Sequence, residues 1–157
     1  MKIVYVHHGN RKLGNPPTQE DDLTEIGYKD CEVAGEILLS NKNRQNYKTI
    51  YTSPFFRCKK TAEIINNKLN LPIIEDERLN EMGSIPNETW VDLQTRVGEC
   101  IDEIVSRYEE NDVVICVTSG VNISAFINKA YNLKPSENAP FLGVPSCSPI
   151  MFDYRGE

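Results

Sequence analysis

The chain has 157 residues, of which 39% are hydrophobic and 25% are charged. This length and composition suffice for one compact core, so we expect residues 1–157 to form a single domain. Lysine and arginine number 17 against 23 acidic residues, a formal net charge of −6, which leaves no broad cationic surface for a nucleic-acid partner.

The first part of the chain predicts a strand, a loop and a helix. Ile3–Val6 is short, apolar and rich in β-branched residues, which is typical of a buried strand, and the polar stretch from Asn10 to Asp22 predicts a loop. A helix is then expected over Leu23–Leu39, with Thr24 as its N-cap. Small residues recur along it at spacings of four, three and four and predict a close approach to a sheet. This stripe consists of Gly27, Cys31, Ala34 and Leu38.

A second strand and helix follow the loop from Ser40 to Tyr47. Thr49–Thr52 predicts a buried strand, and Ser53 followed by Pro54 predicts an N-cap and the first residue of a helix. The helix is expected to continue to Leu69 through an apolar stripe. That stripe consists of Phe55, Cys58, Ala62, Ile65 and Leu69.

The remaining elements continue this alternation. Two further buried strands are predicted over Leu71–Ile74 and Val113–Thr118, and they flank a long amphipathic helix from Trp90 to Tyr108. A helix over Ile123–Ala130, a loop from Asn132 to Ser146 and a final strand over Pro149–Tyr154 complete the chain. The proline at its start suits an edge strand, for which an antiparallel direction is one option. Strands that alternate with helices predict a three-layer α/β/α fold with a mostly parallel sheet.

Two further features concern location. The apolar runs stop far short of the 18 or more residues that cross a bilayer, so we expect no membrane partner. The five cysteines are an odd, widely spaced set, which favours reduced thiols and a cytoplasmic protein. The sequence carries no signal for an oligomeric state.

Chemically distinctive residues lie just beyond the predicted strands, where open parallel sheets bind their ligands. Neutral imidazole is a nucleophile toward phosphorus, guanidinium groups bind phosphate oxygens, and a carboxyl group can protonate a leaving oxygen. Four separate segments are therefore expected to meet in a pocket suited to phosphoryl transfer. The residues concerned are His7, His8, Arg11, Arg57, Glu81, Ser119 and Gly120.

The motifs resemble those of the histidine phosphatase superfamily, the phosphoglycerate mutase-like proteins. Val6–Arg11 is similar to the family's Arg-His-Gly signature, and Leu23–Gly27 to its Leu-Thr-x-x-Gly segment. Thr52–Ala62 is similar to the segment Ser-Pro-x-x-Arg-x-x-x-Thr-Ala. Arg78–Glu81 and Val114–Gly120 fill the two remaining motifs in the right order. Five motifs in register imply this family's fold over most of the chain.

The resemblance implies a role for each candidate residue. His8 would be the phosphorylated nucleophile, Glu81 the leaving-group acid and Arg57 a phosphate ligand. Arg11 is similar to a second arginine that acid-phosphatase members carry. The implied activity is hydrolysis of a small phosphomonoester, with neither a cofactor nor a metal. Mutase activity is expected less, because 157 residues leave little room for the mutases' additional segments.

The sequence departs from the family at two positions of the implied phosphate-binding set. His7 replaces an arginine and Ser119 replaces a second histidine, although both residues, with Gly120, remain candidate phosphate ligands. Because each lost donor lowers the rate, reduced activity is expected. One alternative is a catalytically silent protein on the same fold that binds a phosphate-bearing ligand or has a regulatory role. Another is that Ser119 is a deliberate substitution that traps ligand.

Simpler interpretations of single residues remain open. His8 can be a core histidine, and Arg57 can pair with a surface carboxylate such as Glu63. A metal site at His7 and His8 is disfavoured because neighbouring strand residues project in opposite directions. Ser119 lacks the flanking pattern of a serine hydrolase. The other carboxylates that compete with Glu81 for the acid role are Asp76, Glu77 and Glu88.

Overall fold

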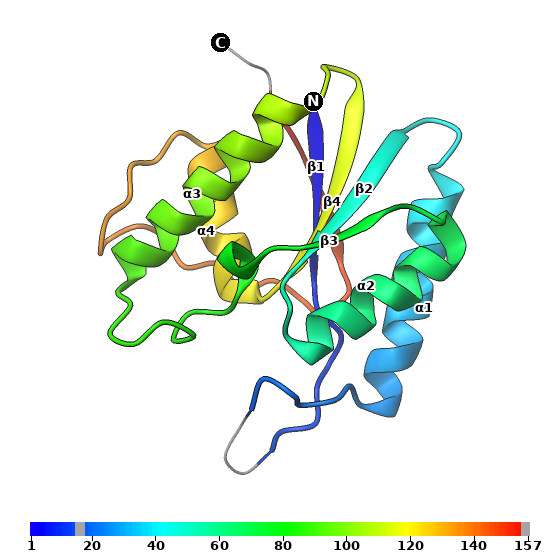
Figure 1. Ribbon diagram of the computed structural model, residues 1–157, viewed down its shortest axis with the longest axis horizontal. Coiled ribbons are helices and arrows are strands. Elements are labelled where there is room, and N and C mark those ends of the chain that lie inside the picture. The colour runs from blue at the N-terminus through cyan, green and yellow to red at the C-terminus, as the bar shows by residue number, and fades with distance from the viewer. Residues whose placement is uncertain (15–17, 155–157) are drawn as a thin grey trace.

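The computed structural model describes residues 1–14 and 18–154. Helices and strands alternate in the order that the sequence predicts, and a short 3-10 helix, η1, precedes the longest helix (Figure 1). The elements are β1 (Lys2–His7), α1 (Glu25–Ser40), β2 (Asn46–Thr52), α2 (Phe56–Leu69), β3 (Ile73–Glu75), η1 (Glu77–Leu79), α3 (Trp90–Arg107), β4 (Asp112–Thr118), α4 (Gly120–Ala130) and β5 (Pro149–Asp153).

The strands form one five-stranded sheet in the order β3-β2-β4-β1-β5. The first four strands are parallel and β5 runs antiparallel to β1 at the edge. In the β1–β4 register His7 lies opposite Thr118, and in the β2–β4 register Thr52 lies opposite Val117. The carboxyl ends of the three central strands therefore meet at one edge of the sheet.

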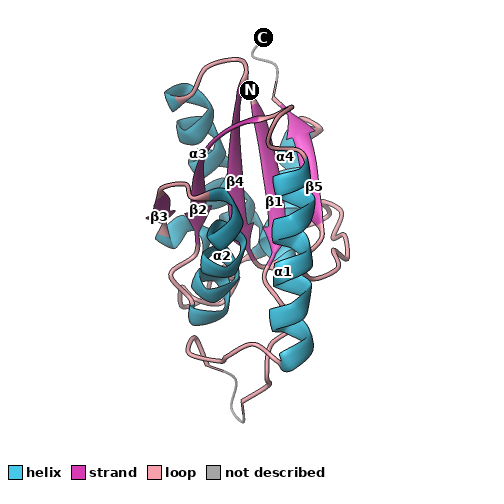
Figure 2. Ribbon diagram, turned by 90° about the vertical axis from the view of Figure 1, so that its right-hand side faces the viewer, coloured by secondary structure: helices cyan, strands magenta, loops and turns pink. Residues whose placement is uncertain are grey.

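Helices cover both faces of the sheet (Figures 1 and 2). One core cluster lies between the sheet and α1 and α2, and the second lies between the sheet and α3 and α4. The predicted three-layer α/β fold with a mostly parallel sheet is confirmed. No helix within residues 1–14 and 18–154 is long and apolar enough to span a bilayer.

The start and the buried stripe of α1 follow the prediction. Thr24 is extended and its hydroxyl oxygen accepts a hydrogen bond from the Gly27 N–H at 3.0 Å, as expected of an N-cap. The stripe is buried, and its small residues permit close contacts. A Cβ on Gly27 would lie 2.2 Å from the Asn10 carbonyl oxygen, so only glycine allows α1 to begin directly against the segment that follows β1.

Two predictions about local structure are wrong. The N-cap of α2 is Phe55 and not Ser53, because the chain stays irregular through Pro54. Ser53 instead accepts a hydrogen bond from the Phe55 N–H at 3.2 Å. The segment predicted as a third buried strand forms β3, which is exposed at all three residues because it lies at the sheet edge and pairs only with β2.

The predicted loops at Ser40–Tyr47 and Asn132–Ser146 are largely irregular, although β2 begins inside the first of them at Asn46. The loop from Asn10 to Asp22 is described except at residues 15–17, which lie outside the described part of the chain. Its two ends come together in an isolated bridge between Arg11 and Leu23. This bridge places Arg11 beside the start of α1.

Candidate active site

His8 directly follows β1, and hydrogen bonds to backbone carbonyls fix its position. Its N–H donates to the Thr118 carbonyl at 2.9 Å, and its side chain is buried. Nδ1 lies 2.9 Å from the Gly9 carbonyl oxygen, which is only an acceptor, so the proton belongs on Nδ1. Nε2 therefore keeps a free electron pair. That electron pair accepts a hydrogen bond from Arg57 Nε at 3.2 Å.

The surroundings of His8 keep its imidazole neutral. Burial, together with the nearby His7, Arg57 and Arg11, lowers the pKa of His8 to about 3, because burial and neighbouring positive charge both disfavour a charged imidazole. A histidine with this pKa carries no charge near neutral pH. The side chain thus has both the tautomer and the charge state of a nucleophile.

Arg57 lies on the first turn of α2 and connects His8 to a carboxylate. Its side chain is buried, and Nη2 lies 2.5 Å from Glu81 Oε2. The guanidinium carbon lies 4.9 Å from the centre of the Phe55 ring, a cation–π contact. Glu63, the alternative partner considered from the sequence, pairs with Lys60 on the surface. The ion pair of Arg57 therefore belongs to the candidate site.

Arg57, Glu81 and Arg11 line one hollow of about 270 Å³ beyond the carboxyl ends of the strands. Arg11 Nη1 lies 2.6 Å from Asp21 Oδ2, and its side chain is 23% exposed. The hollow thus combines two guanidinium groups with one carboxylate. His8 lies against the inner side of Arg57, through the hydrogen bond to Nε.

Other carboxylates near the Glu81 segment have different partners. Asp76 pairs with Arg78 at 2.6 Å, and Glu88 pairs with Arg96 at 2.7 Å. Neither these two nor Glu77 is among the described residues that line the hollow, whereas Glu81 is.

His7 lies beside His8, contrary to the expectation that the two side chains project apart. The ring centres are 4.6 Å apart because β1 ends at His7 and strand alternation stops there. His7 Nδ1 donates to the Val144 carbonyl at 2.8 Å, and burial lowers the pKa of the ring. A Cβ on Gly120 would lie 3.1 Å from His7 Cε1, so the glycine makes room for this ring. Within the described chain, no three histidine, cysteine or acidic side chains are grouped to hold a metal ion.

Ser119 is buried and takes part in a different network. Its hydroxyl donates to Asn122 Oδ1 at 3.1 Å, and the Asn122 amide donates to the carbonyls of Leu79 and Asn80 at 2.9 and 3.0 Å. Thr118 Oγ1 donates to the same Leu79 carbonyl at 2.6 Å. These contacts fix the segment that ends at Glu81. Ser119 thus does not line the hollow. Through Asn122 it belongs to the hydrogen-bond network that holds the segment carrying Glu81.

Sequence reasoning missed Asn122 and gave no role to Thr61. Thr61 accepts from the Gly9 N–H at 2.9 Å and donates to the Arg57 carbonyl at 2.7 Å, so it links the end of β1 to α2. Its place in a family-like motif was the available signal. For Asn122 the signal was a polar residue in the first turn of a predicted helix, next to the apolar residues Ile123, Ala125 and Phe126 that are buried with it.

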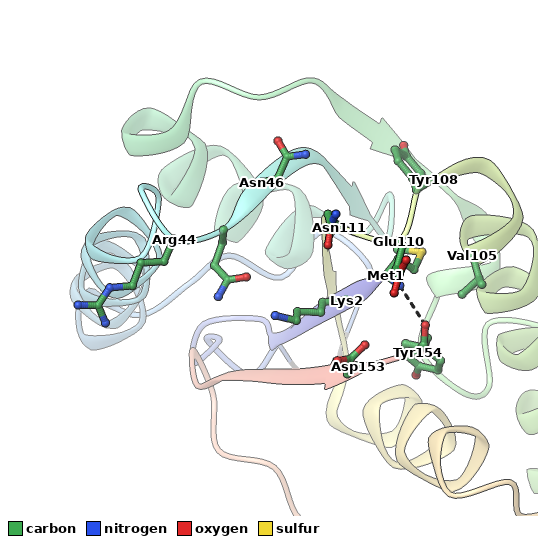
Figure 3. A pocket seen from close by; sticks show the side chains of 11 residues that line it. Met1, Lys2, Arg44, Asn46, Val105, Tyr108, Glu110, Asn111, Asp153 and Tyr154 are labelled. Atoms are coloured by element: carbon green, nitrogen blue, oxygen red, sulfur yellow. Dashed lines mark hydrogen bonds between the residues drawn. The ribbon is translucent and has the colours of Figure 1, made fainter. Parts of the chain in front are cut away.

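The larger hollows lie elsewhere. One of them, about 930 Å³, lies at the amino ends of β1, β2 and β4, where the Met1 ammonium group donates to the Tyr154 carbonyl at 3.0 Å (Figure 3). Another of about 360 Å³ lies between α3 and α4. Neither contains a residue of the predicted site, so size alone does not identify the functional hollow.

Comparison with known proteins identifies the family that the chain matches. Residues 8–84 and 82–157 match the family model described as histidine phosphatase superfamily, branch 1. No curated protein matches the chain in sequence. Solved structures match it in fold over nearly its whole length.

The YhfR protein of Bacillus stearothermophilus is 24% identical with a TM-score of 0.81, covering 99% of this chain and 92% of that one. A mycobacterial glucosyl-3-phosphoglycerate phosphatase with VO3 is 21% identical with a TM-score of 0.76, covering 96% and 90%. A phosphoserine phosphatase mutant of Entamoeba histolytica in complex with phosphoserine is 15% identical with a TM-score of 0.75, covering 98% and 91%.

Proposed function

Because the chain belongs to branch 1 of the histidine phosphatase superfamily, we propose that it hydrolyses a small phosphomonoester through a phosphohistidine on His8. One observation carries this proposal. His8 presents an unprotonated Nε2 3.2 Å from Arg57 Nε, and the same guanidinium group bonds Glu81 at 2.5 Å. A nucleophile, a phosphate ligand and an acid therefore lie within one connected set.

In the first step the phosphoryl group binds in the hollow. Its oxygens accept hydrogen bonds from the Arg57 guanidinium N–H groups that otherwise donate to His8 and Glu81. Arg11 lies at the outer side of the hollow and can bind the same phosphoryl group. His8 Nε2 then forms a bond to phosphorus while the bond to the leaving oxygen breaks. Protonated Glu81 gives its proton to that oxygen.

In the second step water hydrolyses the phosphohistidine. Glu81, now a carboxylate, takes a proton from a water molecule whose oxygen bonds to phosphorus, and the phosphorus–nitrogen bond breaks. The electron pair returns to Nε2 and inorganic phosphate leaves. The proton stays on Nδ1, hydrogen-bonded to the Gly9 carbonyl oxygen throughout, which keeps Nε2 as the reacting nitrogen.

We propose a lower rate than the family motif would give. The positions of the family's first arginine and second histidine hold His7 and Ser119. The His7 proton is directed to Val144 and the Ser119 hydroxyl to Asn122, so neither group donates into the hollow as it stands. Loss of one preorganised donor costs about 10²- to 10³-fold in kcat.

Small phosphorylated molecules are the proposed substrates. The hollow is about 270 Å³, and its two guanidinium groups favour an anion. Two of the similar structures are phosphatases of glucosyl-3-phosphoglycerate and phosphoserine, which are phosphomonoesters. We therefore propose that the substrate of this chain is also a small phosphomonoester.

A second candidate function is binding of a phosphate-bearing ligand without turnover. The observation that favours it is the hydrogen bond from Arg57 to His8 Nε2, because it occupies the electron pair that the reaction needs. In this case the ligand would bind to Arg57 and Arg11 while His8 stays unmodified.

The test uses p-nitrophenyl phosphate with the wild-type protein and His8→Ala. Turnover that His8→Ala abolishes, together with acid-labile phosphate on His8 in a mass spectrum of rapidly quenched protein, would support the proposal. Turnover that survives His8→Ala would overturn it. Binding of phosphate in a calorimeter without any turnover would instead support the second function.

A further inference from the structure

Two cysteines lie in contact behind the His7–Gly9 segment. Cys31 on α1 and Cys147 in the loop before β5 are 116 positions apart in the chain, and their Sγ atoms are 3.3 Å apart. Cys31 is fully buried and Cys147 is 7% exposed. Cys147 also has a φ of 55°, a left-handed conformation that is uncommon for a residue other than glycine.

The contact between the two sulfurs favours charge on one of them. Cys147 and Cys31 share a hydrogen bond, and the Cys31 thiol can also donate to Thr61 Oγ1 at 3.5 Å. The contact with Cys147 lowers the pKa of the Cys31 thiol and raises that of Cys147. The thiolate is the reactive form of cysteine, so Cys31 is activated relative to an ordinary buried thiol.

The remaining three cysteines have thiols whose pKa is raised. Burial raises the pKa of Cys58 and of Cys100 to about 12, and that of Cys116 also lies well above its ordinary value. Oxidation of thiols follows thiolate character and exposure, and redox-active cysteines often lie next to a second thiol. Within this pair Cys147 is the one that reaches the surface, at 7% exposed. The chain therefore offers one dithiol and three inert thiols.

We propose that Cys31 and Cys147 form an oxidation site at which a peroxide converts the two thiols into a disulfide. One sulfur, as the thiolate, bonds to a peroxide oxygen while the O–O bond breaks, which gives a sulfenic acid. The second thiol bonds to that sulfur, the S–O bond breaks, and water leaves with the thiol proton. In total two thiols and one hydrogen peroxide give one disulfide and two waters, and two electrons pass to the peroxide.

The position of the pair couples this reaction to the candidate active site. The Cys147 N–H donates to the His7 carbonyl at 2.9 Å, and a Cβ on Gly9 would lie only 2.7 Å from Cys31 Sγ. A disulfide needs its sulfurs about 2.05 Å apart, so the two sulfurs must approach each other by about 1 Å, and the contacts of Cys31 and Cys147 pass this movement to the His7–Gly9 segment. A misplacement of that size costs up to about 10²-fold in rate.

The test begins with wild-type protein treated with hydrogen peroxide, alkylated, and mapped by mass spectrometry. The expected result is a cross-linked peptide pair joining Cys31 to Cys147, the loss of two alkylatable thiols, and full recovery of both thiols with dithiothreitol. Cys31→Ser and Cys147→Ser should each abolish the cross-link. The matched control Cys100→Ser, a buried cysteine on the other side of the sheet, should keep it.

Other outcomes would overturn the proposal. These are two thiols that stay alkylatable after peroxide, a cross-link that involves another cysteine, or oxidation to sulfinic acid in place of a disulfide. Because the mapping uses wild-type protein, it does not depend on the folding of any variant.

The coupling to His8, which rests on the proposed function, has its own readout. Turnover of p-nitrophenyl phosphate should fall about tenfold on cross-linking and return with dithiothreitol, and unchanged turnover after complete cross-linking would contradict the coupling. Absence of turnover before peroxide would contradict the proposed phosphatase and leave the cross-link result unaffected.

Discussion

The two sides of the candidate site carry different kinds of side chain. On the α1–α2 side, Arg57 and Arg11 direct charged donors into the hollow, and His8 lies directly behind them. On the α3–α4 side, Ser119 and Asn122 are neutral, buried and hydrogen-bonded to each other or to the backbone. The first side is suited to bind phosphate. The second side fixes the backbone that carries the acid.

Arg57→Ala tests the charged side of the site, and, apart from His8→Ala, we expect it to have the largest effect of the substitutions considered. We expect kcat/KM for p-nitrophenyl phosphate to fall about 10²- to 10³-fold, because the variant loses a buried donor to the transferring group. Arg57→Lys should recover only part of this loss, since lysine keeps the charge and lacks the bidentate geometry. Steady-state kinetics measure both effects. A loss below tenfold with an unchanged circular dichroism spectrum would show that charge on this side matters little.

Glu81→Gln tests the acid that lies between the two sides. Glutamine cannot donate a proton to the leaving oxygen, so turnover of an alkyl phosphate should fall about 10²-fold. Turnover of p-nitrophenyl phosphate should fall less than about tenfold in the first step, because its leaving group needs little protonation. Equal losses on the two substrates would indicate that Glu81 acts only in what both substrates share, as the partner of Arg57 or as the base toward water, and not as the leaving-group acid.

Asn122→Ala tests the neutral side. Loss of the contacts to Leu79 and Asn80 should displace Glu81 and lower turnover of the alkyl phosphate about tenfold, with little change for p-nitrophenyl phosphate. The matched control is Asn128→Ala, a buried asparagine on the same helix whose amide donates to Pro140. Both variants should lose about 1 to 3 kcal/mol of folding free energy. If both show the same substrate dependence, Asn122 has no special role in placing the acid.

The smallest effect that we predict is on stability as a function of pH. The folded-state pKa of His8 is about 3 and lies below that of the unfolded chain, so between these values the unfolded state binds more protons. Stability therefore falls as pH decreases through this window, by less than about 1 kcal/mol between pH 7 and pH 6. Urea unfolding should show a weaker pH dependence for His8→Asn and an unchanged one for Ser119→Ala.

Much of the fold followed from the sequence because local signals and periodicity agreed. The Thr24 N-cap, the small-residue stripe of α1 and the order of strands and helices needed no information from distant parts of the chain. Ser53 failed as an N-cap because the chain stays irregular through Pro54 and α2 begins only at Phe56; the Ser53 hydroxyl instead donates to Asn80 Oδ1 at 2.6 Å. The exposure of β3 depends on its place at the sheet edge, which composition does not encode.

The charged half of the site was more predictable than the neutral half. His8, Arg57 and Glu81 could be named because their chemistry and their positions after strands both pointed to phosphate. The role of Asn122 could not be predicted, since its partners are backbone carbonyls more than 40 positions away. The contact between Cys31 and Cys147 depends in the same way on packing of α1 against the last loop.

The pairing of β5 with β1 has a practical consequence for handling the protein. It brings Tyr154 to Met1, at the end of the sheet remote from His8 (Figure 1). A surface anchor or fluorophore attached at that end of the sheet would therefore lie far from the candidate active site. The phosphatase assays proposed above should then work on immobilised or labelled protein without steric interference from the attachment.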